Sequence, residues 1–238
     1  MAPKSVISQT SAATVLAEAG EWETIMSQDA ETMLDVYLDI KSPHAYLAVR
    51  PSLEVARDYK VRINFLPYTL SYVAFGLTTS VDPDNKRRPP NPAADRKARM
   101  YYTAARQYAA LQGLPFRNPS RLLDSTLAHK AFLFAKQQAL EVQFLMQVYV
   151  HGWGSGWRDY EMESLEQLRG TLVAIGAHTD SFEAYMASNG AGDVKLQSCM
   201  AKAESSGFTG VPHYVFYDTA LGRELGLFGR EHLTLIRE

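Results

Sequence analysis

Residues 33–47, MLDVYLDIKSPHAYL, decide how this chain is expected to fold. Residues 33–40 form a near-continuous apolar run, which is typical of a central strand covered on both faces. Ser42 then offers a capping oxygen, and Pro43 stands at the first helical position, where a missing N–H has no cost. The stretch therefore predicts a strand, a short turn, and a helix that begins at Ser42.

The start of this helix is also the first candidate for a binding site. The first N–H groups of a helix have no partner within it, and they point with the positive end of the helix dipole beyond the strand's carboxyl end. Anions and thiolates are stabilised at such a place. We therefore expect chemistry near Ser42.

The segments on either side extend this unit. Residues 43–59 are predicted to be helical, with Pro51 kinking or dividing the helix. Residues 61–66, VRINFL, alternate apolar and polar side chains and predict a second strand, parallel to the first through a right-handed crossover. From residue 67 to 92 the sequence predicts a loop, with DPDNKRRPPNP as its strongest cluster of helix and strand breakers.

Helical patterns then dominate before the chain returns to strands. Helices are predicted over residues 93–112, 125–150 as two helices or one kinked helix, 161–175, 181–188 and 191–205. Residues 214–217 and 223–228 predict strands, and a closing helix follows from residue 229. The order is similar to an α/β thioredoxin-like fold with a large all-helical insertion. The predicted units are an N-terminal lead over 1–31 with one or two short helices, a thioredoxin-like domain over 32–86 and 207–238, and a helical insertion domain over 87–206.

Composition excludes several classes of function. The chain has 238 residues, 46% of them hydrophobic, and a net charge of −2 with scattered basic residues, which argues against a nucleic-acid surface. No apolar stretch is long enough to span a membrane. The single Cys199 cannot form an internal disulfide, and the early acidic residues argue against a transit peptide. We expect an intracellular protein, cytoplasmic in the first instance with an organelle left open.

The histidine spacing, two tryptophans and the single cysteine are expected to reflect structural roles. The six histidines include no pair at metal-ligand spacing, so no metal site is predicted. Trp153 and Trp157, in a Gly-rich segment, are expected to line a cleft or to pack the helical insertion. Cys199 is expected to be a small, buried or half-buried side chain.

Three motifs taken together resemble one known family. The chain is similar to the DsbA-like 2-hydroxychromene-2-carboxylate isomerases and kappa-class glutathione transferases over about residues 33–238. The motifs are Asp39-x-x-Ser42-Pro43-x-x-Tyr46-Leu47-Ala48, Gly210-Val211-Pro212 before a strand, and Phe228-Gly229-Arg230 after the last strand.

The resemblance implies a glutathione site. Ser42 matches the family's active-site serine, whose hydroxyl bonds the sulfur of glutathione; the alternative role of a simple helix cap is compatible with it. Val211 and Pro212 match the family's cis-proline segment, in which the residue before the proline pairs its backbone with the cysteinyl part of glutathione. From the sequence alone an ordinary trans bond is favoured, because few X-Pro bonds are cis.

The remaining glutathione contacts are matched less well. Arg230 and Glu231 align with the turn that holds the γ-glutamyl end, although Arg230 precedes the acid here. Asn85 and Lys86, before Pro89 and Pro90, resemble the family's Asn-Lys-Pro-Pro segment. Lys97, with Arg96 beside it, falls where the family places a second basic residue. The alternative for these cations is a solvated charged loop, and a family aspartate is replaced by Ala104.

His44 is a departure from the family, which usually carries an aromatic or apolar residue there. A helix N-terminus favours the neutral imidazole, which suits a proton shuttle beside a thiolate. The alternative is an exposed histidine without a role in catalysis.

The function that the resemblance implies is a glutathione-dependent isomerase. Reversible addition of thiolate to a conjugated, aromatic-derived small molecule, with Tyr68, Tyr72 and Phe75 helping to accept a flat substrate, would allow rotation before elimination. A kappa-like glutathione transferase and a non-catalytic thioredoxin-fold binding module remain alternatives. A disulfide oxidoreductase is disfavoured, because Ser42 and Ala45 leave no thiol pair. The sequence leaves the oligomeric state open, although members of the family are commonly homodimers.

Overall fold

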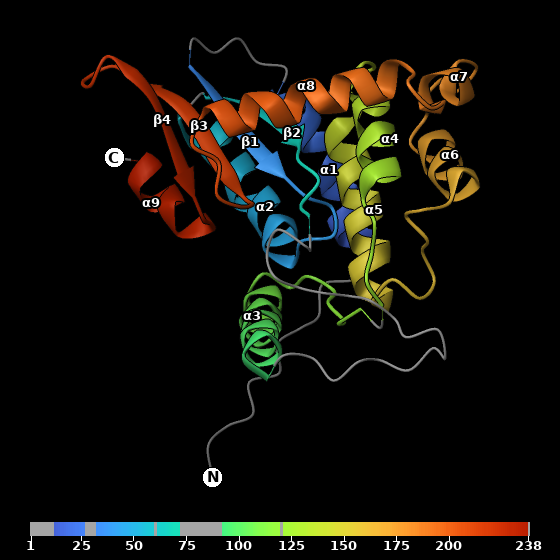
Figure 1. Ribbon diagram of the computed structural model, residues 1–238, viewed down its shortest axis with the longest axis horizontal. Coiled ribbons are helices and arrows are strands. Elements are labelled where there is room, and N and C mark those ends of the chain that lie inside the picture. Colours follow the sequence, from blue (N-terminus) through green and yellow to red (C-terminus); the bar gives the residue numbers. More distant parts are fainter. Residues whose placement is uncertain (1–11, 27–31, 60, 72–91, 120, 238) are drawn as a thin grey trace.

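A four-stranded mixed sheet forms the centre of the computed structural model, which describes residues 12–26, 32–59, 61–71, 92–119 and 121–237. The strand order is β2-β1-β3-β4 (Figure 1). β1 is parallel to β2 and antiparallel to β3, which is antiparallel to β4. The strands are β1 (Met33–Leu38), β2 (Arg62–Pro67), β3 (His213–Asp218) and β4 (Arg223–Phe228). The predicted thioredoxin-like arrangement is confirmed.

β1 has the burial that its sequence predicts. Every residue of the strand after Met33 is buried, and the strand lies between β2 and β3. A strand covered on both faces has no polar side to alternate with, which explains its near-continuous apolar run.

Helices cover the sheet and extend beyond it (Figure 1). The predicted helix over residues 125–150 is two helices, because Ala139 adopts a left-handed backbone with φ 56° between them. α1 packs against α5 and buries Val15 and Ala19, so the N-terminal lead contains a structural helix. The helices are α1 (Ala12–Met26), α2 (Pro43–Tyr59), α3 (Pro92–Leu111), α4 (Thr126–Lys136), α5 (Glu141–Ser155), α6 (Leu165–Ala174), α7 (Phe182–Met186), α8 (Ala191–Ser205), the 3₁₀ turn η1 (Arg230–His232) and α9 (Leu233–Ile236). α3 to α8 fall between β2 and β3 in the sequence, as the predicted helical insertion requires, whereas the exact domain boundaries stay a prediction.

The two tryptophans pack the helical part, which was one of the two roles expected of them. Trp153 and Trp157 are buried, and Trp153 stacks on Phe116 with ring centroids 5.1 Å apart. A Cβ at Gly152 would overlap the Trp157 ring, so the glycine makes room for it. Cys199 is half-buried on α8, as expected.

Pro51 does not divide α2, contrary to one of the expected outcomes. Proline has no N–H to donate to the carbonyl four residues earlier, which here belongs to Leu47. The side chain of Gln112, just after α3, donates its Nε2 to that carbonyl at 3.1 Å. The missing helix bond is therefore replaced by one from another segment.

Replacing Gln112 by leucine is expected to lower the free energy of unfolding by about 1–2 kcal/mol, because a carbonyl loses its donor. In a Pro51→Ala background the new N–H at position 51 can serve that carbonyl, so the same change should cost less. Urea unfolding of the four variants measures both effects. An equal loss in both backgrounds would show that the Gln112 bond does not compensate for the proline.

Candidate active site

Ser42 caps α2 at the end of β1. Its N–H donates to the Asp39 carbonyl at 2.9 Å, and its Oγ accepts from the Ala45 N–H at 3.4 Å. The residue is only 9% exposed, so the hydroxyl is held at the edge of the protein interior. The predicted cap is confirmed, and the start of α2 points beyond the carboxyl end of β1.

The peptide bond between Val211 and Pro212 is cis, as the family resemblance implies. It directly precedes β3, whose first residue His213 pairs with Tyr37 near the end of β1. The cis bond therefore lies beside the end of β1, where the turn to Ser42 begins. The Pro212 carbonyl accepts the Gly229 N–H at 2.9 Å, which links this segment to the turn that contains Arg230.

His44 lies two residues into this helix start and is half-buried. Burial lowers its pKa, and the charge of Arg230 lowers it further while Glu231 opposes the shift. The charges of Arg230 and Glu231 therefore both act on the imidazole. The ring meets Tyr101 of α3 edge to face, with centroids 5.7 Å apart. The neutral form is favoured, as expected, with burial as the largest cause.

Nε2 of His44 is shielded from solvent and has no hydrogen-bond partner within the described part of the chain. Buried polar atoms are usually paired, so an orphaned nitrogen beside a helix N-terminus is unusual. A ligand group that donates a proton or a hydrogen bond would satisfy it.

Arg230 and Lys97 both lie against aromatic rings of α3. The Arg230 guanidinium lies 3.8 Å from the centroid of the Tyr108 ring, and Lys97 Nζ lies 5.9 Å from that of Tyr101. Such cation–π contacts hold cations in place without neutralising them. Two cations, Arg230 of η1 and Lys97 of α3, are therefore held against rings of α3, and the Tyr101 ring also contacts His44.

Glu231 is exposed at the start of η1, and Gly229 before it has φ 109°. This positive φ is one that side chains with a Cβ rarely adopt, so the turn favours glycine. Tyr68, one of the aromatic residues expected beside the substrate, is half-buried and stacks on Phe208 with centroids 3.8 Å apart. Ala104, which replaces a family aspartate, is half-buried in α3.

The structure thus gathers His44, Arg230 and Glu231 around the helix that Ser42 caps, with Lys97 on the neighbouring α3. Arg96 is exposed on the same helix. Asn85, Tyr72 and Phe75 lie outside the described residues. The roles proposed for all of these side chains stay predictions.

A buried polar cluster that the sequence did not predict lies beneath Ser42. The side chains of Asp39, Lys41, Ser125 and His129 are all buried and in contact with one another. Asp39 near the end of the apolar run, and Lys41 directly after the run, are the signal in the sequence for a buried charged pair. No sequence pattern near Asp39 indicates that Ser125 and His129, which lie more than 80 residues later, contact it.

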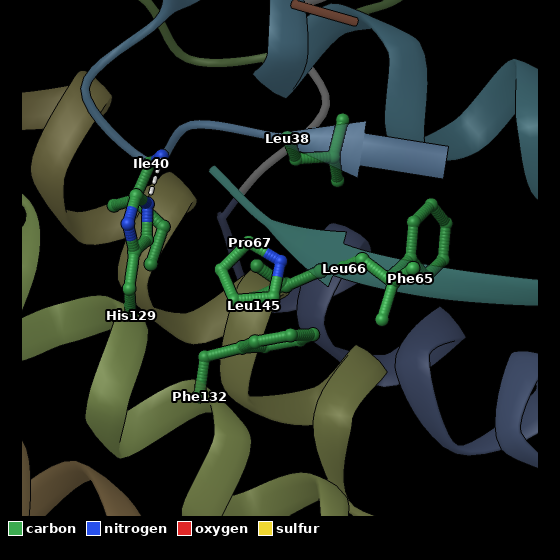
Figure 2. A pocket seen from close by; sticks show the side chains of 8 residues that line it. All are labelled: Leu38, Ile40, Phe65, Leu66, Pro67, His129, Phe132 and Leu145. Carbon is green, nitrogen blue, oxygen red and sulfur yellow. Dashed lines mark hydrogen bonds between the residues drawn. The ribbon is translucent and has the colours of Figure 1, made fainter. Parts of the chain in front are cut away.

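A small cavity lies beside this cluster, between the ends of β1 and β2 and the helices α4 and α5 (Figure 2). Its volume is about 10 Å³, enough for about one water molecule. His129 contributes the polar group to a lining that is otherwise apolar. The cavity is far too small for a substrate.

The described ranges contain neither a candidate metal site nor a candidate membrane-spanning helix. They contain no group of three or more His, Cys, Asp or Glu residues that could hold a metal ion. None of the helices described is long and apolar enough to cross a membrane.

Comparison with known proteins gives consistent results. A family model for the DSBA-like thioredoxin domain matches residues 33–238. A 2-hydroxychromene-2-carboxylate isomerase from Pseudomonas putida is 26% identical over 182 residues, which cover 76% of this chain and 83% of that protein.

Solved structures agree at the level of the fold. A structure of 2-hydroxychromene-2-carboxylate isomerase superposes with a TM-score of 0.65 at 22% identity, covering 86% of this chain and 92% of that one. The cytosolic disulfide reductase DsbM from Pseudomonas aeruginosa, solved with GSH, gives a TM-score of 0.58 at 16% identity, covering 84% and 92%.

Proposed function

Because this chain belongs to the DSBA-like thioredoxin domain family, we propose that it is a glutathione-dependent isomerase of a conjugated, aromatic-derived small molecule. The observation that carries the proposal is the capped start of α2 beside the cis Val211–Pro212 bond. The curated relative named as an isomerase supports this choice among the reactions of the family.

The residues at the start of α2 fit a bound thiolate. The Ser42 hydroxyl can donate a hydrogen bond to an anion, and the helix N-terminus stabilises negative charge there. The unpartnered Nε2 of His44 can accept the proton that a thiol releases. When bound, glutathione would supply a thiolate that adds reversibly to a double bond, so that the bond can rotate before elimination.

The other matched residues would hold the rest of the tripeptide. The backbone of Val211 is proposed to pair with its cysteinyl part, and Pro212 would fix that segment. Arg230 and Lys97 are the cations available for its carboxylates, since each lies on an aromatic ring rather than in an ion pair that the structure describes. Asn85 and Glu231 are the remaining proposed contacts.

Isothermal titration calorimetry with glutathione tests the proposal first. We expect saturable heat with glutathione, and weaker binding with S-methylglutathione, which has no thiol to ionise. The reaction test is isomerisation of 2-hydroxychromene-2-carboxylate, which should require glutathione. No heat at millimolar glutathione would favour a binding module, and a stable glutathione adduct as product would favour a transferase.

Replacing His44 by glutamine or phenylalanine is expected to change the pH dependence of the reaction. The lowered pKa of His44 keeps the wild-type imidazole neutral down past pH 6.5, so the wild-type rate should fall only below that pH. Both variants should be slower and lack this acidic limb. Rate profiles against pH measure this, with His151→Gln, an exposed histidine of α5, as the control. Coincident profiles would remove His44 from the reaction.

A further inference from the structure

Asp39 is the centre of the buried cluster beneath Ser42. Its Oδ1 accepts the Lys41 N–H at 3.1 Å and the Ser125 hydroxyl at 2.6 Å, and its Oδ2 accepts the Leu70 N–H at 2.7 Å. One carboxylate therefore joins the turn before Ser42, the segment after β2 and the start of α4.

The Ser125 hydroxyl serves Asp39 instead of its own helix. Ser125 stands at the N-cap of α4, yet its side chain makes no capping bond there. It accepts a bond from Lys41 Nζ at 3.2 Å while it donates to Asp39. A serine at an N-cap normally stabilises its own helix through this bond, and here the bond is replaced by those to the cluster.

His129 holds the same turn from the other side (Figure 2). Its Nε2 accepts the Ile40 N–H at 3.1 Å, and its Nδ1 lies 2.7 Å from the Thr69 hydroxyl. Because Nε2 acts as an acceptor, this arrangement requires the neutral ring with its proton on Nδ1. The positive charge that faces Asp39 in this arrangement is therefore the ammonium of Lys41, 3.2 Å from Oδ2.

Stability alone does not explain a buried ion pair at this place. Removing two charges from water costs several kcal/mol, and apolar pairs of similar volume are often as stable or more stable. Asp39 and Lys41 are at most 4% exposed in their side chains. The pair also stands immediately before Ser42, where the proposed chemistry needs a stable anion. A buried carboxylate so close would oppose that anion unless its charge is cancelled.

We propose that Lys41 is a positioning residue that provides the counter-charge to Asp39, so that Asp39 can anchor the turn before Ser42 without opposing an anion at the start of α2. This inference deepens the proposed function, because the anion would be the bound thiolate. Lys41 itself does not touch that thiolate in this scheme; it acts through Asp39.

The other groups around the pair are taken into account. His129 of α4 lies 3.3 Å from Asp39 Oδ1 through Nε2 and could replace Lys41 if it gained a proton. Tyr149 of α5 donates to the Asp39 carbonyl at 3.5 Å and is buried, which raises its pKa, so it stays neutral. The pKa of Asp124, before α4, is lowered against the effect of its burial by hydrogen bonds from Thr126 and by the charge of Lys41. The test therefore includes a variant of His129.

The pKa of a thiol placed at position 42 measures, without glutathione, how far the charge of Lys41 cancels that of Asp39. The reporter is the full chain with Ser42→Cys and Cys199→Ser, so that the ultraviolet absorbance of one thiolate is titrated against pH. Adding Lys41→Met should raise the thiol pKa by about one unit, because the Asp39 charge is no longer cancelled. Adding His129→Gln as well removes the other group that could become cationic, and the rise should be at least as large.

The decisive variant removes both charges. Adding Asp39→Asn to Lys41→Met should return the thiol pKa to within about 0.3 unit of the reporter, because no net charge remains. A merely structural role predicts the opposite, since this variant also loses the carboxylate that anchors the turn. The matched control is Lys130→Met, a buried lysine bonded to Asp193 at 2.9 Å, which should leave the titration unchanged.

Two results would overturn the proposal. One is an unchanged thiol pKa in Lys41→Met/His129→Gln, and the other is a rise that Asp39→Asn does not reverse. Should the singly charged variants fail to fold, the neutral pair still decides, because its thiol pKa must match the reporter. A failure here leaves the calorimetric test of glutathione binding untouched, and an absence of glutathione binding would leave this charge balance standing.

Discussion

Replacing Ser42 by alanine is expected to lower kcat/KM for the glutathione-dependent isomerisation by about tenfold to a hundredfold. The hydroxyl is held at the N-cap of α2 with its Oγ accepting from Ala45, which leaves its proton free to be donated to an anion. A hydrogen bond to a charged group contributes about 1.5–3 kcal/mol, and each 1.4 kcal/mol corresponds to tenfold in rate. Steady-state kinetics with saturating glutathione measure the loss.

The loss of the helix cap has to be separated from the loss of this bond. Ser164 is a matched control, because its side chain accepts from the Gln167 N–H at the N-cap of α6 at 3.2 Å. Ser164→Ala should cost about 1 kcal/mol of stability with unchanged kinetics, whereas Ser42→Ala should also raise the pKa of the bound thiol. An isomerase rate that survives Ser42→Ala would reduce Ser42 to a structural cap.

Replacing Asp39 by alanine is expected to lower the free energy of unfolding by about 3–5 kcal/mol at pH 7. The change leaves the buried ammonium of Lys41 uncompensated and removes the acceptor for the N–H groups of Lys41 and Leu70. Urea unfolding followed by circular dichroism measures it. Asp58→Ala is the control, because Asp58 forms ion pairs with Arg57 and Arg237 on the surface, where little change is expected.

The same carboxylate predicts a pH dependence of stability. The ammonium of Lys41 and the hydroxyl of Ser125 hold the pKa of Asp39 well below its usual 3.8 despite its burial. A lowered carboxyl pKa contributes stability that is fully present above pH 3.8 and is lost as the pH falls towards the folded-state value. Wild-type stability should therefore fall more steeply below pH 3.8 than that of Asp39→Asn. Parallel stability curves for the two proteins in acid would contradict this.

Much of the fold could be predicted because its signals are local. The apolar run of β1, the cap and proline at the start of α2, and the strands at the end of the chain each depend on neighbouring residues. Even the cis bond before Pro212 was implied by a motif, although the motif had to come from a family. That α2 continues through Pro51 was not predictable. The Leu47 carbonyl, which receives no hydrogen bond from Pro51, accepts one from the side chain of Gln112, far along the chain.

The candidate site also combines features that the local sequence determines with features that depend on distant segments. The sequence by itself determined that a capped helix begins at Ser42 and that a histidine stands two residues later. Only the tertiary structure decided which groups act on them: the charges of Arg230 and Glu231 near the C-terminus act on His44, and His129 of α4 contacts Asp39. A cap is fixed by backbone geometry within a few residues, whereas a buried charge depends on which distant segments pack against it. For that reason Lys41, which in the sequence is a single polar residue directly after an apolar run, becomes a counter-charge only in the folded protein.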